Sequence, residues 1–229
     1  KKVCAPENNG GVLVGKGIYT PRSIAVRCAV VLIGVLVTSL GSSFYIFANL
    51  GTDPVTSFVQ GVSSTMAISF GSAMNIFNLV CFVLVLIFNR KLINIGTVIY
   101  TLLLGWAFDA IGVVFSKVLP ANLSIVTRVL MLCVGTVLLG FGLGLYQGAR
   151  LGAGPSDAMN QMIAAKLNIP LAWERVGFDI IMVVGGFLLG GVISVGTLVG
   201  MLAVGPIMGP TMNLFIPKID RWSKLKEAV

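Results

Sequence analysis

Four long stretches of the chain contain no Asp, Glu, Lys or Arg, and they limit its possible folds more than any other feature. They cover residues 28–52, 54–89, 129–149 and 180–217. A helix needs about 20 apolar residues to cross the hydrocarbon core of a bilayer. Charged residues make up 10% of the sequence, against about 25% in an average soluble domain. The stretches do not alternate in polarity as membrane β-strands do, so the sequence predicts an all-α polytopic membrane protein.

The available residue types narrow the chemistry that the chain can carry out. The sequence contains no His, which excludes catalysis and metal binding through imidazole. Its four cysteines, Cys4, Cys28, Cys81 and Cys133, lack the spacing of a metal site or a redox motif. The net charge of +8 is better explained by membrane topology than by nucleic-acid binding. We therefore expect no enzymatic activity, no cofactor, no metal and no nucleic-acid partner.

The uncharged stretches predict six transmembrane helices and two shorter helices. The stretch from Ile180 to Pro217 is too long for one span and is divided near Gly190-Gly191. The six spans are expected at residues 25–47, 70–89, 95–116, 127–148, 173–190 and 194–216. The two short helices, 54–67 and 155–168, each begin at a proline, which is favoured at the first helical position. They are too short and too polar to span, and either re-enter the membrane or lie at its interface.

An internal repeat relates the two short helices and the spans around them. At a spacing of 101 residues, Tyr45 matches Tyr146 and Pro54 matches Pro155, and the string Leu-Gly-x-x-Pro occurs in both halves. After a deletion of one residue the spacing becomes 100, which matches Gly96-Thr97 to Gly196-Thr197. Each half therefore has three transmembrane helices and one short helix. The predicted parts are a cytoplasmic tail (1–24), a first repeat (25–117), a second repeat (127–216) and a basic cytoplasmic tail (217–229).

The odd number of spans in each half predicts that the two repeats insert in opposite orientations. With the N-terminus in the cytoplasm, 14 of the 16 basic residues lie on the cytoplasmic side, and only Lys117 and Arg128 lie outside. This distribution follows the positive-inside rule. We therefore expect inverted-topology repeats, with both termini in the cytoplasm and the lipid bilayer as the main partner. The sequence leaves the oligomeric state open.

Two strings in the equivalent loops resemble a known family. YIFANLGTDP and YQGARLGAGPSD are similar to motifs of the YczE/YyaS/YitT family of bacterial integral membrane proteins, and the resemblance covers nearly all of residues 25–216. It implies a multi-pass protein of the bacterial plasma (inner) membrane. The family motif tends to read Pro-x-Asp in both halves. Here the second half ends this motif at Asp157, whereas the first ends it at Thr56 and carries its acid, Asp53, before the proline.

The two helix starts are the first group of candidate binding residues. Inverted repeats with broken helices are typical of secondary transporters, whose sites lie where short helices begin at membrane depth. Glycine permits the sharp turn before each helix, and the positive end of a helix favours an anion or a carboxylate. An interfacial turn that contacts no ligand is the alternative. The candidates in this group are Asn49, Gly51, Asp53, Gly152, Gly154, Ser156 and Asp157.

Acidic residues inside the predicted spans are the second group, because an ionised carboxylate is costly at the bilayer centre. Asp179 lies four residues after Arg175, and we expect the two to pair on one helix face. Asp109 has no basic residue within one turn. It either hydrogen-bonds a neighbouring helix or faces a watery cavity, where it binds a cation, a proton or the substrate. Asn75 and Asn78 could share that cavity.

Four repeat-matched side chains near the ends of spans are expected at the membrane surface. Arg27 and Arg128 can extend their guanidinium groups to the lipid headgroups. Tyr45 and Tyr146 fit the aromatic anchors that are common at the membrane interface.

The predicted repeat, the helix starts and the buried acids favour a secondary transporter or permease for a small polar or charged solute. It would work by alternating access between the two halves, with a proton or another cation as coupling ion. One alternative is a non-transporting membrane regulator or assembly factor. Another is the substrate-binding membrane subunit of a multi-chain importer. A membrane-embedded enzyme is disfavoured, because the sequence has no convincing group of nucleophile, base or metal ligands.

Overall fold

The computed structural model describes residues 21–120 and 122–223, and in these ranges the fold is built from helices with no strand. A short helical turn, η1 (Arg90–Leu92), follows the third of eight α-helices. The α-helices are α1 (Pro21–Ala48), α2 (Pro54–Met66), α3 (Phe70–Asn89), α4 (Ile95–Val118), α5 (Ile125–Gly148), α6 (Pro155–Leu167), α7 (Leu171–Leu188) and α8 (Val195–Trp222). The predicted all-α class is confirmed, and each predicted helix has a counterpart.

The two predicted tails lie mostly outside the described residues. Of the N-terminal tail predicted at 1–24, only residues 21–24 are described, and they form the first turn of α1. Of the C-terminal tail predicted at 217–229, residues 224–229 are outside the described part. Residues 217–222 instead continue α8 past Pro217. A proline is tolerated inside a helix of a membrane bundle because neighbouring helices and side chains can satisfy the backbone groups that it frees.

In the described part of the chain, five helices are long and apolar enough to cross a membrane, namely α1, α3 together with η1, α4, α5 and α8. The sequence predicted six spans, and the difference is α7. This helix has 18 residues and carries three charged residues, Glu174, Arg175 and Asp179, within that length. Five apolar helices of this length are enough to make the chain a multi-pass membrane protein.

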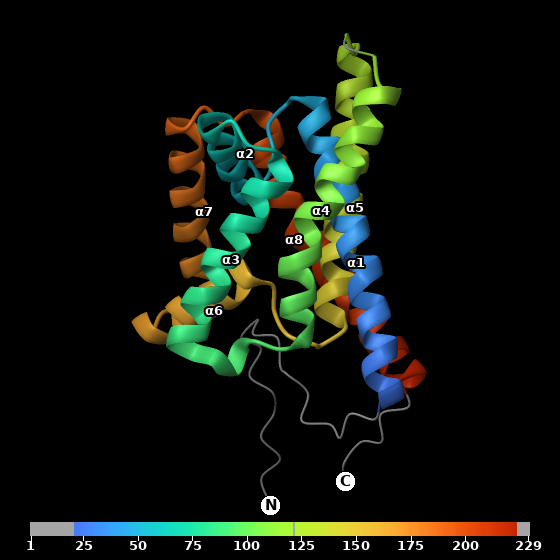
Figure 1. The fold of residues 1–229 in the computed structure, drawn as a ribbon, viewed down its shortest axis with the longest axis vertical. Coiled ribbons are helices and arrows are strands. Elements are labelled where there is room, and N and C mark those ends of the chain that lie inside the picture. Colours follow the sequence, from blue (N-terminus) through green and yellow to red (C-terminus); the bar gives the residue numbers. More distant parts are fainter. Residues whose placement is uncertain (1–20, 121, 224–229) are drawn as a thin grey trace, which may run out of the picture.

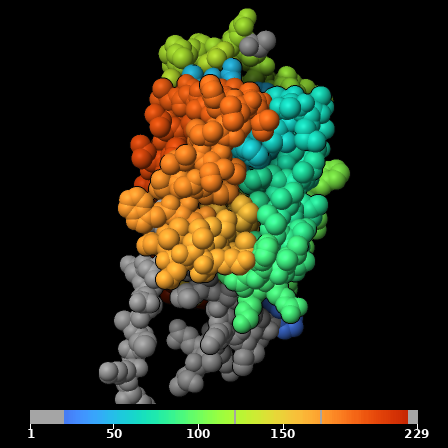
Figure 2. Space-filling view, turned by 90° about the vertical axis from the view of Figure 1, so that its left-hand side faces the viewer, coloured from blue at the N-terminus to red at the C-terminus, as the bar shows by residue number. Residues whose placement is uncertain are grey.

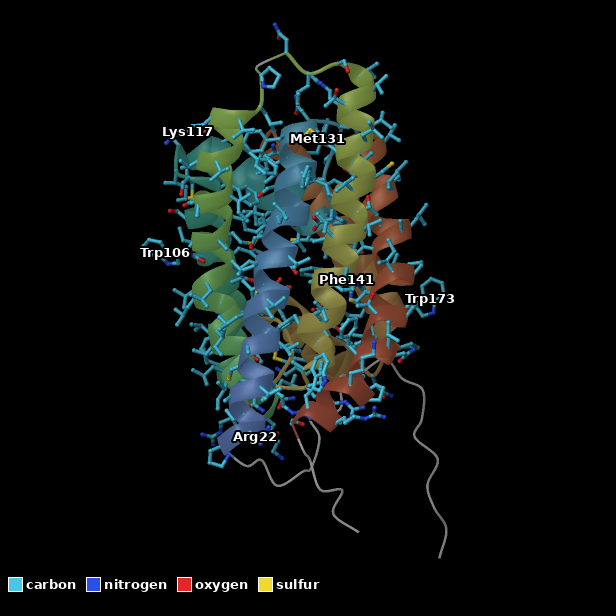
Figure 3. The ribbon with its side chains drawn as sticks, turned by 90° about the vertical axis from the view of Figure 1, so that its right-hand side faces the viewer. Arg22, Trp106, Lys117, Met131, Phe141 and Trp173 are labelled. Carbon is cyan, nitrogen blue, oxygen red and sulfur yellow. The ribbon has the colours of Figure 1, made fainter. Side chains whose placement is uncertain are left out.

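The outer surface of the bundle is apolar. Figure 3 shows Trp106 and Trp173 projecting outward from opposite sides, between Arg22 near one end and Lys117 near the other. Both tryptophan side chains are 72% exposed, and many Leu, Ile and Val residues on the long helices are also exposed. An apolar surface of this extent is unfavourable in water and fits contact with lipid.

The helices run up and down along the longest axis of the molecule, and the two short helices lie near opposite ends. Figure 1 shows α2 near the end to which α4 and α5 extend, and α6 near the other. At the α6 end, α1 begins and α8 finishes. The first and last described helices therefore meet at the same end of the bundle.

Helices α1 and α5 form the central contact and run in opposite directions. Gly34 lies against Tyr146, and Gly41 lies against Leu139, so residue numbers fall along α5 as they rise along α1. A Cβ atom at Gly41 would lie 2.5 Å from the backbone nitrogen of Leu139. Glycine is therefore required for the close approach of the two backbones.

Tyr45 and Tyr146 are buried in the interior instead of lying at the membrane interface. Both side chains are fully buried. The Tyr45 hydroxyl lies 2.6 Å from Thr136 Oγ1, and the ring of Tyr146 packs against Tyr100 at a centroid distance of 4.6 Å. Their surface role was expected from their place near the ends of spans, but the close packing of α1 on α5 encloses both rings.

The two loops that precede the short helices have the same backbone conformation. Gly51 and Gly152 both have positive φ angles, 93° and 113°. Two residues earlier, Asn49 and Arg150 also have positive φ angles, 52° and 53°. The repeat in the sequence is therefore also a repeat in backbone geometry.

Each of these loops is hydrogen-bonded to the last helix of the other half of the sequence. The backbone N–H of Gly196, in the first turn of α8, donates to the carbonyl of Leu50 at 2.8 Å. The N–H of Gly96, in the first turn of α4, donates to the carbonyl of Leu151 at 2.9 Å. The two halves thus exchange equivalent bonds across the molecule.

The short helices also cross between the halves. Helix α2 packs against α7, and α6 packs against α3. Figure 2 shows α6 and α7 meeting the α2–α3 region on one face. Helix α2 begins inside the bundle, where Gly200 of α8 lies against Asp53. It ends near the end of α7, where Thr65 Oγ1 donates to the carbonyl of Leu189 at 3.1 Å.

Arg27 is buried within the protein and does not extend to the lipid headgroups. Its side chain is 1% exposed. It donates to the carbonyl of Ala149 at 2.6 Å and forms an ion pair with Asp220 of α8. Its repeat counterpart Arg128 is half-buried and donates through Nε to the carbonyl of Leu123 at 3.3 Å. An acid at the end of α8 gives the first of these arginines a partner that local sequence did not indicate.

Candidate functional site

A cavity of ≈ 320 Å³ lies where the two halves meet. Its walls come from α1, α3, α4, α5, α7 and α8, and the first residues of α2 and α6 also reach it. This volume is at the lower end of the range for small-molecule sites. The cavity is therefore the best candidate for a binding site in the described part of the chain.

The start of α2 brings the Asp53 carboxylate to the cavity. Its Oδ2 atom accepts a hydrogen bond from the backbone N–H of Thr56 at 3.2 Å and so caps the helix. Its Oδ1 atom is buried and forms no hydrogen bond with the described residues. Burial raises the pKa of the Asp53 carboxyl above its usual value, although the hydrogen bonds with Thr56 oppose this shift.

The start of α6 brings Ser156 and Asp157 to the same cavity. Asp157 Oδ1 lies 3.4 Å from the Arg175 guanidinium, and its Oδ2 accepts a hydrogen bond from Gln147 at 2.9 Å. The ion pair that the sequence predicted between Arg175 and Asp179 is not present in the described part of the chain. Arg175 pairs with Asp157 instead, because α6 packs beside α7 and brings this carboxylate within reach.

Asn78 and Asp179, which the repeat relates, face the cavity from α3 and α7. The Asn78 side chain is 2% exposed, and its Nδ2 atom forms no hydrogen bond with the described residues. A buried polar group without a partner costs about 1–3 kcal/mol. A ligand atom that accepts a hydrogen bond from this amide would remove that cost.

Most of the cavity wall is formed by pairs of residues that the sequence repeat relates. At a spacing of 101 residues in the first part of each half, or 100 in the second, both members of such a pair line the cavity. Among these pairs are Thr38 and Leu139, Val55 and Ser156, Thr56 and Asp157, Met74 and Arg175, Asn78 and Asp179, and Tyr100 and Gly200. Equivalent positions of the two halves therefore converge on one space.

Six of the twelve candidate residues from the sequence line the cavity, namely Asp53, Asn78, Ser156, Asp157, Arg175 and Asp179. Asn49, Gly51, Gly152 and Gly154 do not line it and belong to the two loops. Asn49 is exposed. Gly51 and Gly152, which have positive φ angles, allow the chain to turn toward α2 and α6. These four residues therefore position the helix starts.

Asp109 and Asn75 connect α3 to α4 outside the cavity. Asp109 Oδ2 accepts a hydrogen bond from Ser69 Oγ at 2.7 Å, and its Oδ1 accepts one from the N–H of Gly71 at 2.8 Å. Asn75 Oδ1 accepts one from the N–H of Gly105 at 3.1 Å. Asp109 thus satisfies the free N–H of Gly71 at the start of α3, which is the hydrogen-bonding alternative that the sequence left open for it.

Several cavity residues were not among the sequence candidates. Thr38 and Ser42 on α1 are polar, buried and four residues apart, so they lie on one helix face. This spacing was visible in the sequence and could have identified them. Tyr100 and Phe108 add aromatic walls from α4, but nothing in the sequence distinguishes them from other aromatic residues of the spans.

The chain is similar to three proteins with which it shares most of its length. The uncharacterized membrane protein YczE of Bacillus subtilis is 26% identical over 188 residues, which cover 82% of this chain and 86% of YczE. The uncharacterized protein YyaS of the same organism is 24% identical over 189 residues, with 82% and 92% coverage. An uncharacterized protein of Haemophilus influenzae is 25% identical over 187 residues, with 81% and 83% coverage.

These relatives confirm the resemblance that the two loop strings indicated. No solved structure matches the chain. The model of a family of unknown function, DUF6198, matches residues 25–213, which include the cavity and parts of all eight α-helices. The chain therefore belongs to the DUF6198 family.

Proposed function

We propose that this protein is a secondary transporter for a small polar or charged solute in the bacterial plasma membrane. The observation that carries the proposal is the cavity, since repeat-related residues of both halves line it and both short helices begin at it. Transporters built from inverted repeats bind their substrates at such places, where helices break at membrane depth.

The proposed topology has six spans, two inverted repeats and both termini in the cytoplasm. The opposite directions of α1 and α5 support it, as do the matched loop conformations and the excess of basic residues on one side. Helix α7 is the sixth span in this proposal. Its charged residues Arg175 and Asp179 reach the cavity, which removes the main obstacle to its crossing the membrane.

Alternating access follows from movement of the two halves about the central α1–α5 contact. The ion pair of Arg27 with Asp220 joins α1 to α8 at the proposed cytoplasmic end. Opening the cavity toward the cytoplasm would break this contact. Asp53 and Asp179 line the cavity and replace Asp109 as the groups that we propose to interact with a coupling proton or cation.

The topology is tested by fusing a reporter that is active only in the cytoplasm to either end of the chain. Both fusions should be active. A translocated C-terminus would contradict the inverted-repeat arrangement, because two repeats with an odd number of spans each return the chain to its starting side.

Transport is tested with the purified chain in liposomes that are exposed to a mixture of cationic, anionic, zwitterionic and neutral solutes. At least one solute should enter faster than into protein-free liposomes. Ser42→Phe, which places a ring in the cavity, should abolish this entry in protein that remains monodisperse. Entry without any other protein would also distinguish a transporter from one subunit of an importer. Failure of every solute class to enter would refute the proposal.

A further inference from the structure

We propose that the cavity selects a small organic monocation, namely a protonated amine attached to an apolar body. This inference rests on the proposed function in one respect, since it treats the cavity as the substrate site. It adds the charge and the chemical class of the solute. The arguments are the charge balance of the cavity wall, the unpartnered polar groups and the apolar surfaces opposite them.

The charged side chains around the cavity have an excess of negative charge. Asp53, Asp157 and Asp179 face it together with one basic residue, Arg175. The first turns of α2 and α6 add about half a positive charge each. The wall therefore keeps about one negative charge when the acids are ionised, and one positive charge on the ligand balances it.

The existing partners identify where this excess lies. Asp157 is already bound to Arg175 and Gln147. Asp53 uses one oxygen as a helix cap and leaves Oδ1 buried without a partner in the described residues. Asp179 forms no ion pair in the same part of the chain. Asp53 and Asp179 are thus the two carboxylates available to an ammonium group.

Asn78 gives an independent indication of a bound ligand. Its side chain lines the cavity and is 2% exposed, yet its Nδ2 atom has no hydrogen-bond partner among the described residues. The amide faces the same cavity as Asp179, its repeat counterpart. A hydrogen-bond acceptor on the bound solute, such as an oxygen close to its ammonium group, would satisfy this N–H donor, which the ammonium group itself cannot do.

The rest of the wall favours an organic ligand over a bare ion. Tyr100, Phe108, Met74, Met201 and Met208 line the cavity. A site for a metal ion would surround it with oxygen atoms at close range, and the described part of the chain has no group of three or more His, Cys, Asp or Glu residues that could hold a metal ion. Methionine side chains and aromatic rings accommodate an apolar body. The faces of the aromatic rings also attract an organic cation.

The test uses three probes with a similar apolar body and different charge. 2-Phenylethylamine is a cation, 2-phenylethanol is neutral and 3-phenylpropanoate is an anion at neutral pH. Their affinities for the purified full-length protein are measured by calorimetry. We expect the amine to bind about tenfold more tightly than the alcohol, or better, because a buried charge pair strengthens binding by this order. The anion should bind most weakly.

Two matched variants assign the selectivity to the cavity. Asp179→Asn keeps the shape of the side chain and should lower amine affinity about tenfold while changing alcohol affinity less than about twofold. Asp109→Asn removes another acid of a transmembrane helix, but one outside the cavity, and should change neither affinity. Equal effects of the two variants would overturn the assignment to Asp179.

The possible outcomes separate this inference from the proposed function. Equal or tighter binding of the alcohol or of the anion overturns the inference, as does the absence of measurable binding of all three probes. Entry of anionic solutes into the liposomes with no amine binding would sustain the transporter and refute the cation. Amine binding that depends on Asp179 without entry of any solute would sustain the cation site and refute the transporter.

Discussion

The two halves of the molecule share a backbone plan but present different side chains to the cavity. In the second half, Arg175 and Asp179 occupy two positions on one face of α7, and the first half has Met74 and Asn78 at the matched positions of α3. A similar difference separates Asp157 from Thr56 at the starts of the short helices. Equivalent positions of the two halves thus reach the cavity with different side-chain chemistry, and in our proposal this difference determines what the cavity binds.

The matched arginines Arg27 and Arg128 test whether equivalent positions of the two halves contribute differently to stability. We expect the largest effect here. Arg27→Ala removes a buried guanidinium and leaves Asp220 and the Ala149 carbonyl without it. We expect a loss of about 2–3 kcal/mol, because the buried Ala149 carbonyl loses its donor and the missing side chain leaves an unfilled space. Asp220 contributes less to this loss, since it is 36% exposed and keeps Arg150 at 3.8 Å. Arg128→Ala should cost less than about 0.5 kcal/mol. Thermal unfolding in detergent measures both, and equal losses would show that burial of Arg27 contributes nothing.

A second prediction tests whether the halves are equivalent in packing. A Cβ atom at Gly41 would meet the Leu139 backbone at 2.5 Å, and one at Gly142 would meet the Thr38 backbone at 2.5 Å. Gly41→Ala and Gly142→Ala should therefore lower stability by similar amounts, about 1–3 kcal/mol each. Gly112→Ala is the control, because a Cβ there meets no atom within 4 Å. A tolerated change at either interface glycine would contradict the close α1–α5 contact.

A third prediction moves the negative charge from one half to the other. The double variant Asn78→Asp/Asp179→Asn keeps the number of acids at the cavity and exchanges their positions. If the cavity is symmetric in shape, 2-phenylethylamine should bind within about threefold of its affinity for the unchanged protein, because the charge pair is retained. Asp179→Asn alone lacks that compensation. Calorimetry compares the two, and equal affinity losses would mean that the halves are not interchangeable at this position.

The smallest effect that we expect is a dependence of amine binding on pH. Burial raises the pKa of the Asp53 carboxyl, so lowering the pH protonates it more readily than an exposed acid. Asp157, Arg175, Asp179 and Tyr100 face the same cavity. The amine prefers the ionised form of Asp53, and its affinity should therefore fall by a few-fold between pH 8 and pH 5.5. Binding of 2-phenylethanol is the control, and a parallel fall for both probes would contradict this explanation.

The sequence was sufficient for features that depend on neighbouring residues. Uncharged lengths and prolines determined where helices lie, so α2 and α6 begin at Pro54 and Pro155 as predicted. Features that depend on distant residues were missed. Arg27 binds Asp220, 193 positions away, and local sequence gave no sign of that acid. For Asp109 the sequence left two alternatives, a hydrogen bond to a neighbouring helix or a watery cavity, and it could not choose between them because the partners, Ser69 and Gly71, lie at the start of another helix.

The same distinction explains the partial success at the site. The repeat drew attention to Asp53, Asp157 and Asn78, which do reach the cavity. Arg175 was paired with Asp179 by their helical spacing, whereas the structure pairs it with Asp157 from a different helix. Helix spacing identifies which groups share a face, but only the packing of α6 beside α7 selects between two carboxylates.

The exchanged loop bonds have a consequence for synthesis of the chain. When the first half has left the ribosome, the Leu50 carbonyl has no Gly196 N–H from which to accept a hydrogen bond, and α2 has no α7 to pack against. The first half therefore lacks these contacts until the second half has been synthesised. We also expect that a chain divided between α4 and α5 assembles when its two fragments are produced together, and that each fragment is degraded when it is produced alone.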